Sequence, residues 1–565
     1  MFVRAKKSGA YEYLQLVHNE RVDGRVRQQV IATLGRLDRL QATGQIDALL
    51  ASCARFAERT AVLNTLGQGQ TEATETSKVG PPLVFERLWR ELGLGEILEG
   101  FLADRQFQFP VERAVFLTVL HRLFDPGSDR AAEEWRHGYA IRGVEDLQLH
   151  QIYRAMAWLG EPLPNDQQAG ATPFAPRCMK DRIEEALFAR RSDLFSRLDL
   201  VFFDTTSIYF EGRGGESIGQ YGKSKDHRPD RKQIVVGAVL DNTGRPICCE
   251  LWPGNTSDAK ALIPIVDRLK TRFHIQRICV VADRGMISKK TIAALQAAHR
   301  DTRFILGARL RAVKEIREQV LADKSRYRQV HGPKTGSKDP SPLKVKDVRI
   351  EDRRYIVCYN EDQAYKDRAD REAIVAALGD QLKRGDKSLI GNKGYRKYIK
   401  AAGKRFEIDQ EKVEKEARFD GTWVLQTDLE ISAAEGALKY KELWTVEAVF
   451  RAIPAGIDSL KSVLETRPIF HKCDDTIRGH VFCRFLALVV LKELQSKLAA
   501  RGWTVDPSGD RVEWERLKRD LDALEEITIE NAGRTFVIRT RTRGDAGKAL
   551  QAAGVALGPT VRPAN

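Results

Sequence analysis

The chain has 565 residues, of which 42% are hydrophobic and 30% are charged, and lysine plus arginine exceed aspartate plus glutamate by 93 to 78. This length allows roughly three or four domains, and the hydrophobic content excludes a globally disordered chain. The surplus of +15 favours a polyanionic partner, with nucleic acid ahead of a membrane surface, although a merely basic soluble protein is the plain alternative.

The eight cysteines are scattered and form no C-x-x-C pair, which argues against a zinc ribbon and against a disulfide framework. A reducing cytoplasm fits this cysteine usage best. The first residues, MFVRAKKSGAYEY, show no apolar core of a secretory signal. The most apolar helical stretch, VFCRFLALVVLKEL, carries Arg484 and Lys492 and is therefore predicted to be a core helix.

The N-terminal part is predicted to hold a β-hairpin and helices within residues 1–66. In the hairpin, YEYLQLV and VRQQVIATLG flank the turn signal Asp23-Gly24. Residues 67–80 are polar and rich in glycine and threonine, which predicts a linker. Helical periodicity then runs to about residue 160 and a proline-rich stretch follows, so residues 81–177 are predicted to be a helical region.

Strand patterns dominate residues 178–311. LDLVFFDTTSIYF, KQIVVGAVLD and PICCELWPG precede a helical stretch, and ICVVADRG follows it. This order predicts a mixed α/β sheet in which the fourth strand lies parallel beside the first, through a right-handed crossover. Because apolar runs end on Asp204 and Asp283, the two carboxylates are expected at neighbouring strand ends, close together.

Three further segments complete the chain. Residues 312–440 interrupt the sheet domain with the strand-like stretches RYIVCYN and GTWVLQTD and with polar loops. Residues 441–500 are mainly helical and are expected to return to the core. Residues 501–565 end in a basic segment.

Glu447 is the best candidate for a third carboxylate, because two aspartates alone hold two metal ions poorly. The apolar stripe of an amphipathic helix runs beside it, formed by Leu443, Val446, Phe450 and Ile453. Carboxylates that share a buried rim need a cation, and all-oxygen ligands suit Mg²⁺ or Mn²⁺. The simpler alternative is a surface ion pair between Glu447 and Arg451, four residues on.

Two basic segments have compositions that suit phosphate groups. Residues 383–405 hold nine basic side chains against one acidic, with tyrosine rings available for stacking. The candidates in this segment are Lys393, Arg396 and Lys397, with the rings of Tyr395 and Tyr398. The loop 221–233 between the first two strands adds Lys223, Lys225, Arg228, Arg231 and Lys232. A solvated surface loop is the alternative for each segment.

The motifs DTTSIYFEG, VVADRGM and LWTVEAVFRA…LKSVLETRPIFH resemble those of the DDE transposases of bacterial insertion sequences. The nearest branch has a catalytic helix with the signature Y-x2-R-x3-E-x6-K, and the resemblance covers most of the chain. It implies an RNase-H-like core interrupted by a mostly β insertion. It also implies that Asp204, Asp283 and Glu447 hold two Mg²⁺ or Mn²⁺ ions, which would serve both strand cleavage and strand transfer.

The signature helix departs from the family pattern. Tyr440 falls in place, but the arginine position holds Leu443 and the lysine position holds Pro454. The lysine comes seven residues later, at Lys461, and a proline inside the intervening stretch would break or kink the helix. The DNA-contacting residues expected from these motifs are Arg284, Tyr440, Arg451 and Lys461.

The expected partners are double-stranded DNA, as element ends and as target, and further copies of the chain in a dimer or larger synapse. Residues 81–177 are expected to bind the terminal repeats, and the protein to associate with the bacterial nucleoid in the cytoplasm. Two alternatives stay open: an RNase-H-like nuclease that does not transpose, and a DNA-binding relic with a catalytic helix broken at Pro454. A haloacid-dehalogenase-type phosphatase is disfavoured because it needs an aspartate where Thr206 stands.

Overall fold

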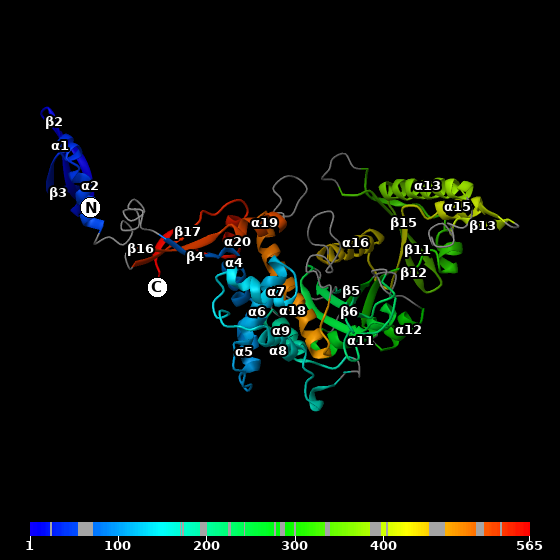
Figure 1. The fold of residues 1–565 in the computed structure, drawn as a ribbon. Coiled ribbons are helices and arrows are strands. Elements are labelled where there is room, and N and C mark those ends of the chain that lie inside the picture. The colour runs from blue at the N-terminus through cyan, green and yellow to red at the C-terminus, as the bar shows by residue number, and fades with distance from the viewer. Residues whose placement is uncertain are drawn as a thin grey trace. The chain divides into compact units, whose positions relative to one another are not determined.

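The computed structural model of the chain divides into two compact units (Figure 1). The first unit comprises Met1–Val79, Ala523–Arg543 and Leu557–Asn565, and the second comprises Gly80–Asp522 and Gly544–Ala556. The structure describes residues 1–22, 25–54, 72–169, 171, 175–191, 201–223, 228–241, 243–275, 278–282, 289–298, 301–333, 340–384, 397–402, 405–450, 469–503, 514–531 and 534–564.

The first unit begins with a three-stranded antiparallel sheet. Its strands are β1 (Phe2–Ser8), β2 (Tyr11–Val22) and β3 (Arg25–Arg36), and β2 is central. Helices α1 (Leu37–Ala42) and α2 (Gln45–Ala54) follow. The predicted hairpin is confirmed as β2 and β3, and β1 adds a strand at the edge of it.

A second sheet of the first unit joins segments from the two ends of the chain. Its order is β18 (Val561–Pro563), β17 (Arg534–Arg539), β16 (Glu525–Asn531) and β4 (Glu72–Lys78). The prediction of a linker over residues 67–80 was therefore wrong for β4. This polar segment has little strand propensity of its own, but β16 supplies the hydrogen-bonding partner that makes it a strand.

The second unit contains the predicted helical region. Its helices are α4 (Gly80–Glu91), α5 (Leu94–Leu102), α6 (Val111–Phe124), α7 (Asp129–Trp135), α8 (Leu149–Gly160), α9 (Met179–Arg190), α18 (Asp474–Ala499), α19 (Trp514–Asp522) and α20 (Ala546–Ala553). The long helix α18 contacts α4, α6, α8 and α20, and it is a buried core helix as expected. No helix in the described part of the chain is long and apolar enough to cross a membrane.

Glycines allow α8 and α18 to approach closely. A Cβ atom on Gly479 of α18 would lie 1.9 Å from the carbonyl oxygen of Met156, and one on Gly160 would lie 2.0 Å from that of Asp475. Both separations are far shorter than any real contact, so only glycine fits at these two positions.

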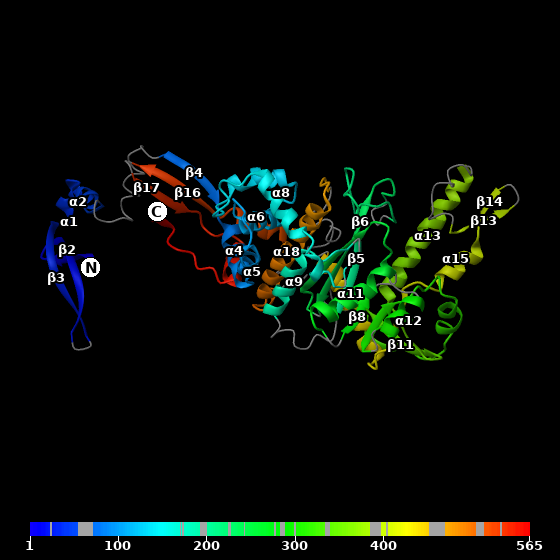
Figure 2. The same ribbon diagram turned by 90° about the horizontal axis from the view of Figure 1, so that it is seen from below.

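The second unit also contains the predicted mixed sheet (Figure 2). Strands β5 (Val201–Tyr209), β6 (Gln233–Asp241) and β7 (Pro246–Pro253) are antiparallel. After helix α11 (Asp258–Arg272), strand β8 (Ile278–Ala282) runs parallel beside β5, as the sequence predicts. Helix α12 (Lys289–Ala298) then leads to β9 (Thr302–Gly307), which is parallel to β8.

Residues 312–440 extend this sheet. The sheet order is β10-β11-β12-β15-β9-β8-β5-β6-β7, so the added strands β10 (Arg328–His331), β11 (Leu343–Ile350), β12 (Arg353–Tyr359) and β15 (Thr422–Thr427) continue it beyond β9. The segment also holds a π-helical turn (Ile316–Val320), the 24-residue helix α13 (Glu361–Arg384), the hairpin β13 (Ile399–Ala402) and β14 (Arg405–Ile408), and α15 (Gln410–Ala417). A mostly β insertion was therefore wrong, because α13 and α15 form a large part of it.

Candidate active site and its surroundings

Asp204 lies within β5, directly after the residues whose pairing with β8 is described. Residues Val201–Phe203 pair with Val280–Ala282 of β8, and Asp204 pairs with Ala238 of β6 on the other side. The strand does not end at Asp204, because the β-branched and aromatic residues after it continue the ladder with β6 as far as Tyr209. The expectation of an aspartate at a strand end was therefore wrong for Asp204, which lies within β5.

The other two predicted carboxylates are described in part. Asp283 follows Ala282, the last residue of β8, and lies outside the described residues together with Arg284. Glu447 belongs to helix α16 (Ala433–Phe450), whose backbone is described at this position. Helix α16 contacts β5, β8 and β9. The backbone elements before Asp283 and around Asp204 and Glu447 therefore meet in one region of the second unit.

The predicted basic loop between β5 and β6 contains local ion pairs. Arg228 bonds to Asp230 at 2.9 Å, and Arg231 lies 3.5 Å from carboxylate oxygens of both Asp230 and Glu211. The alternative of a salt-stabilised surface loop is therefore supported for these two arginines. Lys223 is exposed and Lys232 is half-buried, whereas Lys225 lies outside the described residues.

The second basic segment is described only near its end. Lys397 forms an ion pair with Glu416, and the ring of Tyr398 is buried against Leu378. The prediction that Tyr398 offers a ring for base stacking was therefore wrong. Lys393, Tyr395 and Arg396 lie outside the described residues.

The signature helix is described as far as Phe450. Tyr440 is buried, with 6% of its surface exposed, which argues against a direct DNA contact by its ring. Arg451, Pro454 and Lys461 lie outside the described residues, so the predicted kink and the predicted lysine contact stay predictions.

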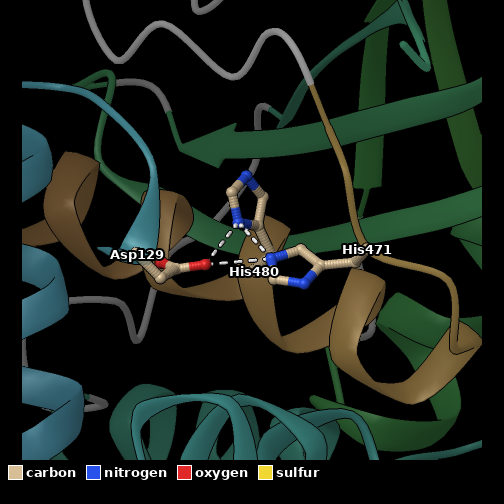
Figure 3. A group of neighbouring side chains, drawn as sticks. All are labelled: Asp129, His471 and His480. Atoms are coloured by element: carbon tan, nitrogen blue, oxygen red, sulfur yellow. Dashed lines mark hydrogen bonds and ion pairs between the residues drawn. The ribbon is translucent and has the colours of Figure 1, made fainter. Parts of the chain in front are cut away.

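A buried cluster that the sequence did not predict joins Asp129, His471 and His480 (Figure 3). The His471 Nε2 atom lies 3.0 Å from Asp129 Oδ2 and 3.2 Å from His480 Nδ1. The distance between Asp129 Oδ2 and His480 Nδ1 is 3.8 Å. Such separations resemble those between ligands of one metal ion, which are roughly 3 Å for bonds of about 2.0–2.1 Å. The distances between these three ligand atoms would therefore allow the group to hold one metal ion. The only sequence signal was the histidine pair of RPIFH…IRGH.

The surroundings of this cluster favour hydrogen bonds over a metal ion. Arg122, which is fully buried, bonds to the other oxygen of Asp129, and Arg484 donates from Nε to His480 Nε2 at 3.4 Å. A histidine that binds a metal through one ring nitrogen donates the N–H of its other ring nitrogen to an acceptor. In His480 that other nitrogen, Nε2, instead faces the N–H donor of Arg484. Two guanidinium groups would also repel a divalent ion. The cluster is therefore a hydrogen-bonded junction between α7 and α18.

The charges in this junction follow from burial and from the arginines. Burial lowers the pKa of His480 to about 3, so this imidazole is neutral at pH 7. Burial alone would raise the pKa of Asp129, but Arg122 and the two histidines lower it well below its ordinary value. Ile469, two residues before His471, forms a β-bridge with Phe210 just after β5.

A second buried cluster ties α9 to the sheet edge at β7. Arg272 of α11 lies 3.1 Å from Glu184, 3.2 Å from Glu250 and 3.4 Å from Asp181. Lys180 lies 2.6 Å from Asp181 and donates to the carbonyl oxygen of Cys249. Burial raises the pKa of Glu184 to about 7, although Lys180 and Arg272 oppose the shift.

Two family models match the chain. Residues 196–463 match the Transposase DDE domain, and residues 2–68 match the N-terminal domain of the IS1634 family transposases. The first match defines the class of protein as a DDE transposase. Together with the second, it shows that the chain belongs to the DDE-type transposases of insertion sequences.

Solved structures with detectable similarity are also transposases. A synaptic complex of the piggyBac transposase with hairpin DNA is 10% identical, with 78% of this chain and 79% of that chain covered and a TM-score of 0.35. A Mos1 transposase paired-end complex with the left transposon end is 16% identical, with 36% and 61% covered and a TM-score of 0.14. No curated protein was found to match the chain.

Proposed function

We propose that the chain binds the terminal inverted repeats of an insertion sequence and cleaves and transfers DNA strands with Asp204, Asp283 and Glu447. One observation carries the proposal. Phe203 and Ala282, which pair in the parallel ladder, immediately precede the two aspartates in the sequence, and helix α16 with Glu447 contacts both strands. The strand order, with three antiparallel strands and two parallel ones beyond β5, supports an RNase-H-like core.

The three carboxylates form an all-oxygen donor set, which fits Mg²⁺ or Mn²⁺ rather than zinc or copper. Two such ions, when bound, would activate an attacking oxygen and stabilise the leaving oxygen at a phosphodiester. The side chains of Asp204, Asp283 and Glu447 would hold and orient these ions. Exposed Lys223, in the loop after β5, would bind a DNA phosphate near them.

The same site would serve two reactions in turn. Water attacks a phosphodiester at the element end and releases a 3′-hydroxyl, and this hydroxyl then attacks a phosphodiester of the target and expels its 3′ oxygen. Because both element ends must be joined to one target, the proposed active form is a dimer or a larger synapse. The expected partners are therefore duplex DNA and further copies of the chain.

The test is cleavage of a duplex that carries the terminal sequence flanking the gene, with purified full-length protein and Mg²⁺. We expect Asp204→Asn, Asp283→Asn and Glu447→Gln each to lower the cleavage rate by at least a hundredfold while DNA binding persists. Glu435→Gln is the matched control, because Glu435 is exposed in the same helix and forms an ion pair with Lys439. Equal cleavage by the control and by Glu447→Gln would overturn the assignment of Glu447.

Two alternative functions would give different results in this assay. A relic would bind the duplex, but the wild-type protein would show no Mg²⁺-dependent nicking. An RNase-H-like nuclease without transposition would nick the DNA but would never join the cleaved end to a target plasmid. Formation of the joined product by the wild-type protein would therefore exclude both.

A further inference from the structure

One face of the N-terminal sheet carries a polar and basic patch, which we name the Arg4 face, next to an apolar row of Phe2, Val17 and Val30 on the same side. Residues directly opposite each other in an antiparallel ladder share a face. Arg4 opposes Gln15, and Gln15 opposes Thr33, so these three side chains form a row across β1, β2 and β3. Lys6 and Tyr13 oppose each other two residues further along and belong to the same face.

The acidic residues of these strands lie on the opposite face. Glu12 opposes Lys7, and Glu20 opposes Arg27, and both pairs alternate with the Arg4 row along β2. No other residue of β1, β2 or β3 is acidic. The Arg4 face therefore presents positive charge without a compensating carboxylate from the described strands.

Hydrogen bonds between side chains order the Arg4 face. Arg4 donates to Gln28 at 2.5 Å and to Gln15 at 3.3 Å, and Gln15 donates to Thr33 at 3.4 Å. Gln28 and Thr33 are exposed, whereas Arg4 and Gln15 are half-buried. The row is therefore a partly preorganised set of donors and acceptors at the surface, which lowers the entropic cost of binding a polar partner.

The size and chemistry of the row suit the major groove of duplex DNA. The groove is about 12 Å wide and admits a two-stranded β-ribbon, so two neighbouring strands of this sheet, spaced by about 4.8 Å, fit it. Arginine pairs with guanine through two hydrogen bonds, and glutamine pairs with adenine in the same way. Strands are an established element for reading this groove.

We propose that the Arg4 face binds the major groove of the element ends, with Arg4, Gln15 and Gln28 at base edges and Lys6 at a phosphate. This assignment rests on the proposed function and adds the surface that recognises the ends. It differs from the expectation that residues 81–177 bind the terminal repeats, and within that region helix α6 is buried over nearly its whole length.

The experiment compares two neighbouring lysines of identical chemistry. Lys6→Ala changes the Arg4 face, and Lys7→Ala is the matched control on the opposite face. Full-length protein is titrated by fluorescence anisotropy against the terminal duplex and against a shuffled duplex of equal composition, over a series of salt concentrations. We expect Lys6→Ala to weaken binding to both duplexes and to lower, by about one, the steepness with which the logarithm of the binding constant falls with the logarithm of the salt concentration. Lys7→Ala should leave the binding constant and this slope unchanged.

Arg4→Ala tests base recognition separately from phosphate binding. Loss of a bidentate base contact is expected to weaken binding to the terminal duplex by roughly ten- to a hundredfold, with little change for the shuffled duplex. At protein concentrations well above the dissociation constant, Mg²⁺-dependent cleavage by Arg4→Ala should recover. Thermal unfolding of each variant, matched to wild type, confirms that the fold is intact.

The outcomes separate this inference from the proposed function. If wild type binds the ends selectively but Lys6→Ala and Arg4→Ala do the same, the Arg4 face is not the recognition surface, and the transposase assignment stands. If Lys7→Ala weakens binding as much as Lys6→Ala, the face assignment is also wrong. If wild type distinguishes neither duplex and cleaves neither, the proposed function itself fails. A change of oligomeric state in Lys6→Ala without DNA would point instead to self-association through this face and would overturn the inference.

Discussion

Replacing Arg272 by methionine should destabilise the second unit strongly. Arg272 is buried and lies within 3.4 Å of carboxylate oxygens of Asp181, Glu184 and Glu250. Without it, Lys180 and Arg268 are the cations of the described residues that remain paired with these three buried carboxylates. Removing one partner of a buried charge cluster typically costs about 3–5 kcal/mol, because the remaining charges stay desolvated.

The assay is urea unfolding followed by tryptophan fluorescence, since Trp252 is buried in the core and lies two residues after Glu250 in β7. At an m-value of about 2 kcal/mol/M, the expected loss lowers the midpoint by roughly 1.5–2.5 M. The control is Arg105→Met, because Arg105 and its partner Glu161 are both about two-fifths exposed, with 42% and 41% of their side-chain surfaces accessible. A surface pair of this kind contributes at most about 1 kcal/mol. Equal midpoints for the two variants would refute the reasoning.

Three further changes test other parts of the structure. Gly479→Ala should reduce the free energy of unfolding by several kcal/mol, because its Cβ would overlap Met156, whereas Gly100→Ala in α5 has open space and should stabilise the helix by about 0.5–1 kcal/mol in the same urea assay. Glu184→Gln should remove a pH dependence of the stability. A carboxyl whose pKa is raised from 4.5 to about 7 stabilises the fold below about pH 4.5 and loses that contribution as the pH rises through 7. The urea midpoint of the wild type should therefore fall over this pH range, and the midpoint of the variant should not. His471→Ala should leave the bound zinc and cobalt content of the purified protein equal to wild type, as measured by mass spectrometry, and a lower content in the variant would show that the junction holds a metal ion.

The order of the core strands could be predicted because each strand carries its own local signal. Apolar β-branched runs mark β5, β6, β7 and β8, and a helical period separates β7 from β8. With those elements in order, the rules of chain connection leave few arrangements, and the parallel pairing of β5 with β8 was among them.

Elements that depend on a distant partner could not be predicted in the same way. β4 is a polar segment that becomes a strand only because β16, more than four hundred residues later, pairs with it. Helix α13, in contrast, has a local signal, since its charged sequence is rich in strong helix formers, so the prediction of a mostly β insertion was wrong where the sequence itself favours a helix.

The candidate site was predictable only as far as its residue types. The apolar run before Asp204 predicted a strand, but no local signal indicated that its pairing with β6 would continue past Asp204 as far as Tyr209. The junction of Asp129 with His471 and His480 was missed because a lone aspartate before a short helix is ordinarily a surface residue. Its burial arises from α18, a helix that lies far away in the sequence.

The position of α18 has a consequence for how the protein is made. Helices α4, α6 and α8 leave the ribosome early, yet the helix they pack against ends at Ala499. At about 5–20 residues per second, the apolar faces of the early helices wait roughly 20–80 seconds for it. A prematurely terminated product would keep those faces bare and would be prone to aggregation or proteolysis, so only a nearly complete translation product can become a stable protein.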